Sequence, residues 1–405
     1  MIERLKKEND DAPFSVIHTL GAPIDFNGNI SRTLGEAIPV ARLGIDVTVV
    51  VSDRVPKTCF EQATDNGVKL SLMNTTFHSN GIGWRLNNLL PLFAATLKAI
   101  GEHQNSILHV SAPSPVTKSF TGLTLGKQVK KPVVLDLHDP WSADLFSLNP
   151  LLMLQTNIMR FVINKADLVI VAHNQLAKLV KSLNPKKPLA VIPNCVDSTL
   201  YQPTERNNLL AKSLEIADDE LVIAFCGHIT EFKGLDVLTR SAKIVLEKCK
   251  NVKFLIIGDG PFLQHVKDLA SKLGVDKNFK FVGFIPQKLL PTYLSLADVC
   301  IAPYKPAEFY KLSLPETPVK VVEYMSMGKP VIMSKISDEN VITWSGGGVQ
   351  VTPGDVNELA SWLISLINDE EMRRTLGRKG RAYAEQNLSW EKMAPTLVEL
   401  YKSLY

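Results

Sequence analysis

The apolar positions of this chain form short continuous runs, and between the runs apolar residues recur with the spacing of a helix. The runs are FSVIHTL, DVTVVVS, SILHVSA, PVVLDLH, LVIVAH and LAVIPN in the first half, then LVIAFCG, VKFLIIGDG, FKFVGF, DVCIAPY and KPVIMS. Most are apolar at successive positions, which is typical of strands buried on both faces of a parallel sheet. Amphipathic segments such as Ile30–Leu43 and Leu235–Lys248 lie between them. The alternation predicts an α/β fold.

The alternation pauses between about residues 194 and 219, where NCVDSTLYQPTERNN carries turn residues and no clear period. A new series of strands and helices then begins at LVIAFCG. We therefore predict two doubly wound, Rossmann-like domains that face a central cleft, with ligands beyond the carboxyl ends of the strands. The predicted domains are 1–196 and 197–386. Residues 387–405 form a last amphipathic helix, which could pack against either domain, including a return to the N-terminal one.

Composition narrows the class of protein. The 405 residues are 45% hydrophobic and carry a net charge of +4, as is ordinary for a soluble globular protein. The longest apolar stretch, Leu89–Ile100, contains Pro91 and Lys98 and is shorter than the roughly 20 residues that span a bilayer. Five scattered cysteines without CxxC spacing argue against a disulfide framework or a zinc site. The charged N-terminus has no apolar leader, so we expect a cytoplasmic protein.

The charge pattern bears on partners. No basic stripe with interleaved aromatic residues is present, so we expect no nucleic-acid partner. The first half is mildly basic, which could favour an anionic membrane surface, although scattered solubilising charge is the simpler interpretation.

Two loops between a strand and a helix could bind an anion. In the first half, Gly28 and Asn29 precede a helix, where glycines let backbone N–H groups approach a ligand. This is no GxGxxG fingerprint, and a purely structural turn explains it equally well. In the second half, GHITEFKG places His228 and Lys233 after a strand and before a helix, a position suited to neutralising a phosphate. Taken alone, Lys233 is better explained as a surface lysine in a loop and His228 as a structural or exposed histidine.

Two acidic motifs follow other strands. PVVLDLHDPW ends its strand in His138 and Asp139, a pair suited to proton transfer or to hydrogen bonds with a polyhydroxyl substrate. Asp136, His138 and Asp139 could instead bind a metal, but no further ligand completes that set. PVKVVEYMSMGKPVI places Glu323 near the start of a predicted helix, Val319–Met327. The partial positive charge there would stabilise an acid, and a carboxylate facing the cleft could also hold ribose hydroxyls.

In this order, the stretches resemble the retaining glycosyltransferases of family 4, which have the GT-B fold. VIPNCVD resembles the family's PNGVD with cysteine in place of glycine, and GHITEFKG resembles its phosphate-binding segment. The other matching blocks are VAHNQLAKLV, IIGDGP, VGFIP, ADVCIAPY and VKVVEYMSMGKPVI, the last containing the second glutamate of the E-x7-E motif. The blocks cover most of the chain.

The resemblance implies a nucleotide-sugar donor bound mainly by the C-terminal domain and an acceptor bound mainly by the N-terminal domain. Glu323 would hold the ribose, and Lys233 would neutralise the diphosphate. Gly28 and Asn29 would line the phosphate side of the cleft.

The same resemblance assigns the remaining roles. His138 would lie near the transferred sugar, and Asp139 could assist the acceptor hydroxyl. The backbone around Phe284 and Ile285 would touch the base.

The sequence departs from the family pattern at two places. His228 stands where the family has arginine. The first glutamate of the motif would fall on Pro315, so that either Glu316 serves in its place or the contact is lost. One branch of the family has the same P-V-K variant, in which Val319 and Lys320 would face the donor.

The resemblance implies sugar transfer with retention through same-face attack by the acceptor. We expect no cofactor and no metal requirement, because no DxD occurs and positive charge can come from Lys233, Lys320 and helix N-termini. A nucleotide-sugar epimerase, a glycoside phosphorylase or a nucleotide-sugar-binding pseudoenzyme would be alternatives. The acceptor could be a lipid, a polysaccharide or another glycan. The segment Gly81–Ile100 could make peripheral contact with a membrane, although a core helix is the favoured interpretation.

Overall fold

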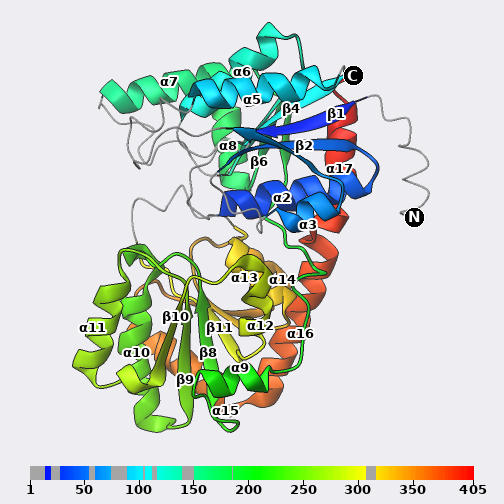
Figure 1. The fold of residues 1–405 in the computed structure, drawn as a ribbon. Coiled ribbons are helices and arrows are strands. Elements are labelled where there is room, and N and C mark those ends of the chain that lie inside the picture. The colour runs from blue at the N-terminus through cyan, green and yellow to red at the C-terminus, as the bar shows by residue number, and fades with distance from the viewer. Residues whose placement is uncertain are drawn as a thin grey trace. The chain divides into compact units, whose positions relative to one another are not determined.

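The computed structural model describes residues 14–19, 28–53, 60–73, 89–103, 105–111, 116–138, 150–184, 186–306 and 316–405. The chain divides into two compact units. The first contains the described residues up to Asn194 together with Trp390–Tyr405, and the second contains those from Cys195 to Ser389. Each unit has one sheet with helices packed on it (Figure 1). The predicted fold class, two Rossmann-like α/β domains, is confirmed.

The sheet of the first unit has seven strands in the order β3-β2-β1-β4-β5-β6-β7, and every pair is parallel. The strands are β1 (Ser15–Thr19), β2 (Asp46–Ser52), β3 (Lys69–Met73), β4 (Ser106–Ser111), β5 (Val133–Leu137), β6 (Leu168–Val171) and β7 (Leu189–Val191). The order reverses between β1 and β4. The carboxyl ends of these two strands therefore diverge into separate connections, as at the ligand sites of doubly wound sheets.

Helices cover both faces of this sheet. They are α2 (Gly28–Arg42), α3 (Glu61–Asp65), α5 (Leu89–Gly101), α6 (Val116–Gln128), α7 (Pro150–Lys165), α8 (Asn174–Leu183) and α17 (Trp390–Lys402). Figure 1 shows α5, α6 and α7 on one side of the sheet and α2 and α3 on the other. Leu92, Ala95 and Ala99 of α5 are buried in the core cluster. The segment considered for membrane contact is therefore a core helix over Leu89–Gly101, and its first part, 81–88, lies outside the described residues.

The sheet of the second unit has six parallel strands in the order β10-β9-β8-β11-β12-β13. They are β8 (Leu221–Cys226), β9 (Val252–Ile257), β10 (Phe279–Gly283), β11 (Val299–Ala302), β12 (Val331–Ser334) and β13 (Gly348–Val351). The order reverses between β8 and β11, so the region beyond their carboxyl ends is the expected ligand position.

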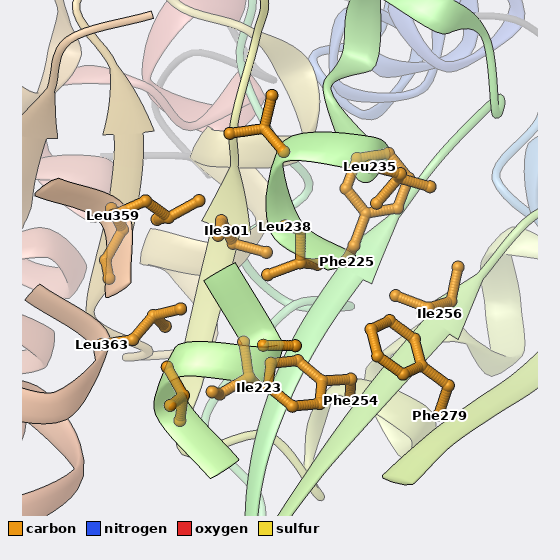
Figure 2. Close-up of a cluster of buried hydrophobic side chains, with 14 of the residues drawn as sticks. Ile223, Phe225, Leu235, Leu238, Phe254, Ile256, Phe279, Ile301, Leu359 and Leu363 are labelled. Carbon is orange, nitrogen blue, oxygen red and sulfur yellow. The ribbon is translucent and has the colours of Figure 1, made fainter. Parts of the chain in front are cut away.

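The helices of this unit pack on both faces of the sheet. They are α9 (Asn208–Ser213), α10 (Leu235–Lys248), α11 (Leu263–Leu273), α12 (Leu290–Leu294), α13 (Val319–Ser326), α14 (Val341–Ser345), α15 (Val356–Asn368) and α16 (Glu370–Asn387), with the 3-10 turns η2 (Glu231–Lys233), η3 (Asp276–Asn278) and η4 (Gln287–Leu289). Figure 2 shows Leu238 of α10, Leu363 of α15 and Ile223 of β8 within one cluster of buried hydrophobic side chains. None of the helices among the described residues has both the length and the apolar character needed to cross a membrane.

Candidate functional site

Lys320, the second residue of α13, places an amino group inside the second unit. Its Nζ is buried and makes no hydrogen bond to a described residue. This atom lies 4.0 Å from the centre of the Phe225 ring. Burial, and then the charge of Lys233, lower the pKa of Lys320 well below its usual value. A buried ammonium without a hydrogen-bonded partner is costly, and a bound anion would remove that cost.

Glu323 lies in the second turn of the same helix and is 7% exposed. Burial raises the pKa of its carboxyl to about 7, although Tyr201 and Lys320 both lower it. The Tyr201 hydroxyl approaches this carboxylate without forming a hydrogen bond of normal geometry. Ser326 Oγ donates to the Tyr201 carbonyl at 2.6 Å and so fixes the segment that carries the tyrosine. A carboxyl that titrates near neutral pH beside a buried lysine is typical of a binding site.

The reversal of strand order positions this pair. The Cys226 amide, at the end of β8, donates to the Tyr324 hydroxyl of α13 at 2.7 Å, which holds α13 against the carboxyl end of β8. The next residue, Gly227, has a φ of 133°, and an added Cβ there would lie 2.8 Å from Lys320 Nζ. Because only glycine leaves this space, the backbone of the β8 loop can approach the ammonium closely.

Lys233 brings a second positive charge to the same region. Its Nζ lies 4.3 Å from the centre of the Phe232 ring and 5.0 Å from that of Tyr304. It is close enough to Lys320 to lower the pKa of that lysine. His228, in the same loop, is exposed. The structure therefore brings the predicted residues Lys233, Lys320 and Glu323 together around one position that suits an anion beside a hydrogen-bond acceptor.

The other predicted residues of the second unit lie farther along the sheet or at the start of α13. Phe284 is 54% exposed just beyond β10, with Ile285 partly buried after it, and β9 separates β10 from β8. Val319 begins α13. Glu316 is buried three residues earlier, and its carbonyl accepts a hydrogen bond from the Val341 amide at 2.9 Å. Whether Glu316 replaces the first glutamate of the motif stays a prediction.

In the first unit, His138 follows β5 and is 6% exposed. Its Nε2 lies 2.5 Å from Asp136 Oδ2. Asp136 also accepts two hydrogen bonds from the Arg32 guanidinium, both 3.0 Å long. Burial alone would raise the pKa of Asp136, but Arg32 and His138 outweigh it and hold this pKa well below its usual value. Asp136 is thus an ionised partner that orients the His138 ring.

Arg32 joins several parts of the first unit. Its Nη1 donates to the Ile192 carbonyl at 3.0 Å and to the Pro193 carbonyl at 3.1 Å, just beyond β7. Its guanidinium also lies 5.6 Å from the centre of the Trp390 ring of α17. A single buried side chain therefore fixes α2, the His138 strand and the end of the seventh strand relative to one another.

Three predicted residues of the first unit have no described side chain. Gly28 and Asn29 form the first turn of α2, and only their backbone is described. Asp139 lies outside the described residues.

Two residues that shape these sites, Tyr201 and Arg32, were not predicted from the sequence. Tyr201 lies in the turn-rich segment, and its hydroxyl reaches a glutamate more than 100 residues later. Arg32 reads as an ordinary charge of an amphipathic helix, although it is 2% exposed. A buried arginine must be paired, so a charged residue on the inner stripe of α2 would have been the available signal.

Comparisons with known proteins give the family. The family model described as glycosyl transferases group 1 matches residues 207–383, and the model described as glycosyltransferase family 4 matches residues 38–200. The N-acetyl-alpha-D-glucosaminyl L-malate synthase of Bacillus anthracis is 26% identical over 321 residues, which are 77% of each chain. The GDP-mannose-dependent alpha-(1-6)-phosphatidylinositol monomannoside mannosyltransferase of Mycolicibacterium smegmatis is 24% identical over 76% of this chain and 80% of its own.

Solved structures give the same fold. Anabaena HepE, crystallised with UDP and glucose, aligns with a TM-score of 0.73 at 19% identity, over 96% of this chain and 99% of its own. The sucrose-phosphate synthase of Thermosynechococcus elongatus aligns with a TM-score of 0.73 at 19% identity, over 96% and 98%. These comparisons do not favour the epimerase or pseudoenzyme alternatives.

Proposed function

This chain belongs to glycosyltransferase family 4 and has the GT-B fold, and from that premise we propose that it transfers a sugar from a nucleotide-sugar donor to an acceptor hydroxyl with retention of anomeric configuration. The names of its relatives support the donor class, since one uses GDP-mannose and one was crystallised with UDP.

The observation that carries this proposal is the buried amino group of Lys320, which has no hydrogen-bond partner among the described residues and which a bound anion would hold in its charged form. The leaving group of the reaction is a nucleoside diphosphate, and its negative charge grows in the transition state. Lys320 and Lys233, with the N-terminus of α13, would supply the compensating positive charge in a site shielded from water. We therefore propose that no metal ion is needed for donor binding.

The remaining donor contacts follow from position. The Glu323 carboxylate would accept hydrogen bonds from the ribose hydroxyls. Val319 would offer its backbone to the donor, and Phe284 and Ile285 would contact the base.

The acceptor reaction is assigned to the first unit. His138, oriented by Asp136, would contact the transferred sugar, and Asp139 would assist the acceptor hydroxyl. We propose that the acceptor attacks the anomeric carbon from the face that the diphosphate leaves, which retains the configuration. The acceptor is a lipid, a polysaccharide or another glycan, and a lipid acceptor would require peripheral contact with a membrane.

Calorimetric titration with UDP, GDP and ADP, each with and without Mg²⁺, tests the donor site. We expect one nucleotide to bind selectively and with the same affinity in both conditions. Binding that depends on Mg²⁺ would contradict the charge assignment. Failure of all three nucleotides to bind would contradict the proposed donor class.

Lys320→Met sharpens this test because it keeps the length of the side chain and removes the charge. Loss of a charged hydrogen bond should weaken nucleotide binding by about tenfold to a hundredfold. Removing a buried charge should also raise the melting temperature of the nucleotide-free protein by a few degrees. The control is Lys335→Met, at an exposed lysine, which should change neither. Weaker binding together with lower stability would instead assign Lys320 to the fold.

A further inference from the structure

The face of the first sheet opposite its main core carries ionisable side chains. Residues alternate between the two faces of a strand. Ile17, Leu108 and Leu135 belong to the hydrophobic cluster on one face. Their neighbours His18 and His109 therefore point to the other face, and the two histidines are directly opposite each other in the β1–β4 pair. Their rings stack with centroids 4.4 Å apart.

Helix α2 adds Glu36 to these histidines. All three side chains are 0% exposed. Five of their polar atoms make no hydrogen bond to any described residue. They are both ring nitrogens of His18, both carboxyl oxygens of Glu36, and Nε2 of His109. Three fully buried polar side chains thus face one another with unused lone pairs. Burying a polar group without a hydrogen-bond partner is costly, so the arrangement calls for a ligand that satisfies all three.

The charges around the cluster favour a cation. Arg32 gives two hydrogen bonds to Asp136, so these two charges compensate each other. The Arg32 Nε also lies 3.1 Å from Glu36 Oε1, but its hydrogen bond goes to Asp136. Burial, and then the charge of Asp136, raise the pKa of the Glu36 carboxyl well above its usual value, although Arg32 lowers it. A bound cation would compensate its ionised form.

We propose that His18, Glu36 and His109 bind one divalent transition-metal ion of the Zn²⁺ type. One ligand atom from each lies within 4.8 Å of the others. His109 Nε2 and Glu36 Oε2 are 3.4 Å apart, and two ligands at about 2.1 Å from a tetrahedral ion are about 3.4 Å apart. Because the two histidine rings are stacked, ion binding would also require one ring, which we take to be that of His18, to turn and move closer. Imidazole nitrogens with a carboxylate oxygen are a donor set that suits zinc.

The surroundings orient these ligands as they do in metal sites. The Tyr401 hydroxyl of α17 is 2.8 Å from His109 Nδ1, which leaves Nε2 for the ion. Arg32 faces the second oxygen of Glu36. Such contacts fix the ring and the carboxylate that bind a metal. The ion would join β1, β4 and α2, and it is structural because no part of its ligand set is exposed. This ligand set differs from Asp136, His138 and Asp139, which the sequence suggested as an alternative metal site. The cysteine spacing argued only against a zinc site built from cysteines, and this site contains none.

Metal analysis of the purified, untagged protein tests the site. Protein produced in medium supplemented with Zn²⁺ should contain about one transition-metal ion per chain after dialysis. A strong chelator should lower its melting temperature by about 5 °C or more, and added Zn²⁺ should restore it. Glu36→Gln, which keeps the shape of the side chain, should lose the ion and the response to the chelator. His265→Ala, at an exposed histidine, should keep both.

Two results would overturn the proposal. One is a metal content well below one ion per chain, both as purified and after incubation with Zn²⁺, in protein that melts cooperatively. The other is a bound ion that Glu36→Gln and His18→Asn both retain. Neither result depends on nucleotide binding, so the test stands apart from that of the proposed function.

Discussion

At the scale of single residues, Glu323 gives nucleotide binding a dependence on pH. Its pKa of about 7 makes the carboxyl mainly neutral below pH ~6 and mainly ionised above pH ~8. The ionised form accepts both ribose hydroxyl hydrogens, so affinity should rise with pH across this range. Lys320 should lower the affinity as pH rises, because the amine that remains after loss of its proton binds phosphate less strongly. Calorimetric titrations at several pH values should therefore show a rise that is followed by a fall.

Substitution separates the two groups. Glu323→Gln should weaken binding at pH 8 by about tenfold to a hundredfold and abolish the rise between pH ~6 and ~8. The matched control is Glu205→Gln, at an exposed position of the same unit, which should leave the profile unchanged. If Glu323→Gln keeps the wild-type pH profile, Glu323 is a helix-terminal charge and not a ribose ligand.

At the scale of elements, α2 and α17 pack so closely that one glycine limits their distance. A Cβ added to Gly35 of α2 would lie 2.1 Å from Trp390 Nε1, and Trp390 is 3% exposed. Helix propensity alone would make Gly35→Ala stabilising by about 1 kcal/mol. The clash with Trp390 should outweigh this gain, so that Gly35→Ala lowers the free energy of unfolding by about 1–3 kcal/mol. Denaturant unfolding measures this change.

Gly101→Ala is the matched control, because a Cβ at Gly101, the last residue of α5, meets nothing within 4 Å. It should leave the free energy of unfolding unchanged or raise it by up to about 1 kcal/mol. Equal effects of the two substitutions would mean that the contact between α2 and α17 is looser than the structure describes.

The elements that the sequence predicted are those with continuous apolar runs. The pattern missed β3 and β13, which are both edge strands. In β3, Lys69 and Leu72 are exposed, and no residue of β13 except Val351 is fully buried. An edge strand has a neighbour on one side only and needs fewer apolar positions. Edge position alone does not remove the signal, however, because the edge strands β7 and β10 were predicted. By contrast, the predicted end of the α13 helix is confirmed to within one residue, since Met327 caps the helix and Gly328 follows with a φ of 69°.

The sequence predicted only those site residues that lie in recognisable blocks near the carboxyl end of a strand. Lys233, Lys320 and Glu323 each lie in a recognisable block, and the rule for parallel sheets placed these blocks at one edge. Tyr201 and Arg32 could not be found in this way, because their partners are distant in sequence and their role depends on burial. The same is true of His18, which reads as part of an apolar strand.

At the scale of the whole molecule, the chain leaves the first unit after residue 194 and returns to it with α17. This helix buries Trp390, Leu397 and Tyr401, and its tyrosine bonds to His109. Ending the chain after Ser389 removes α17 and should therefore destabilise the first unit selectively. Calorimetry should show a lower melting temperature for the first unit and little change in that of the second unit. The affinity for the nucleotide should change by less than about threefold.

A chain that ends after Lys402 keeps the whole of α17 and is the control for shortening as such. It should behave like the full chain in both measurements, because the residues it lacks lie beyond the helix. If ending the chain after Ser389 abolishes nucleotide binding but leaves both transitions in place, the donor site depends on α17 directly. If it lowers both transitions together, the two units unfold as one, and stability is then a property of the whole chain and not of each unit.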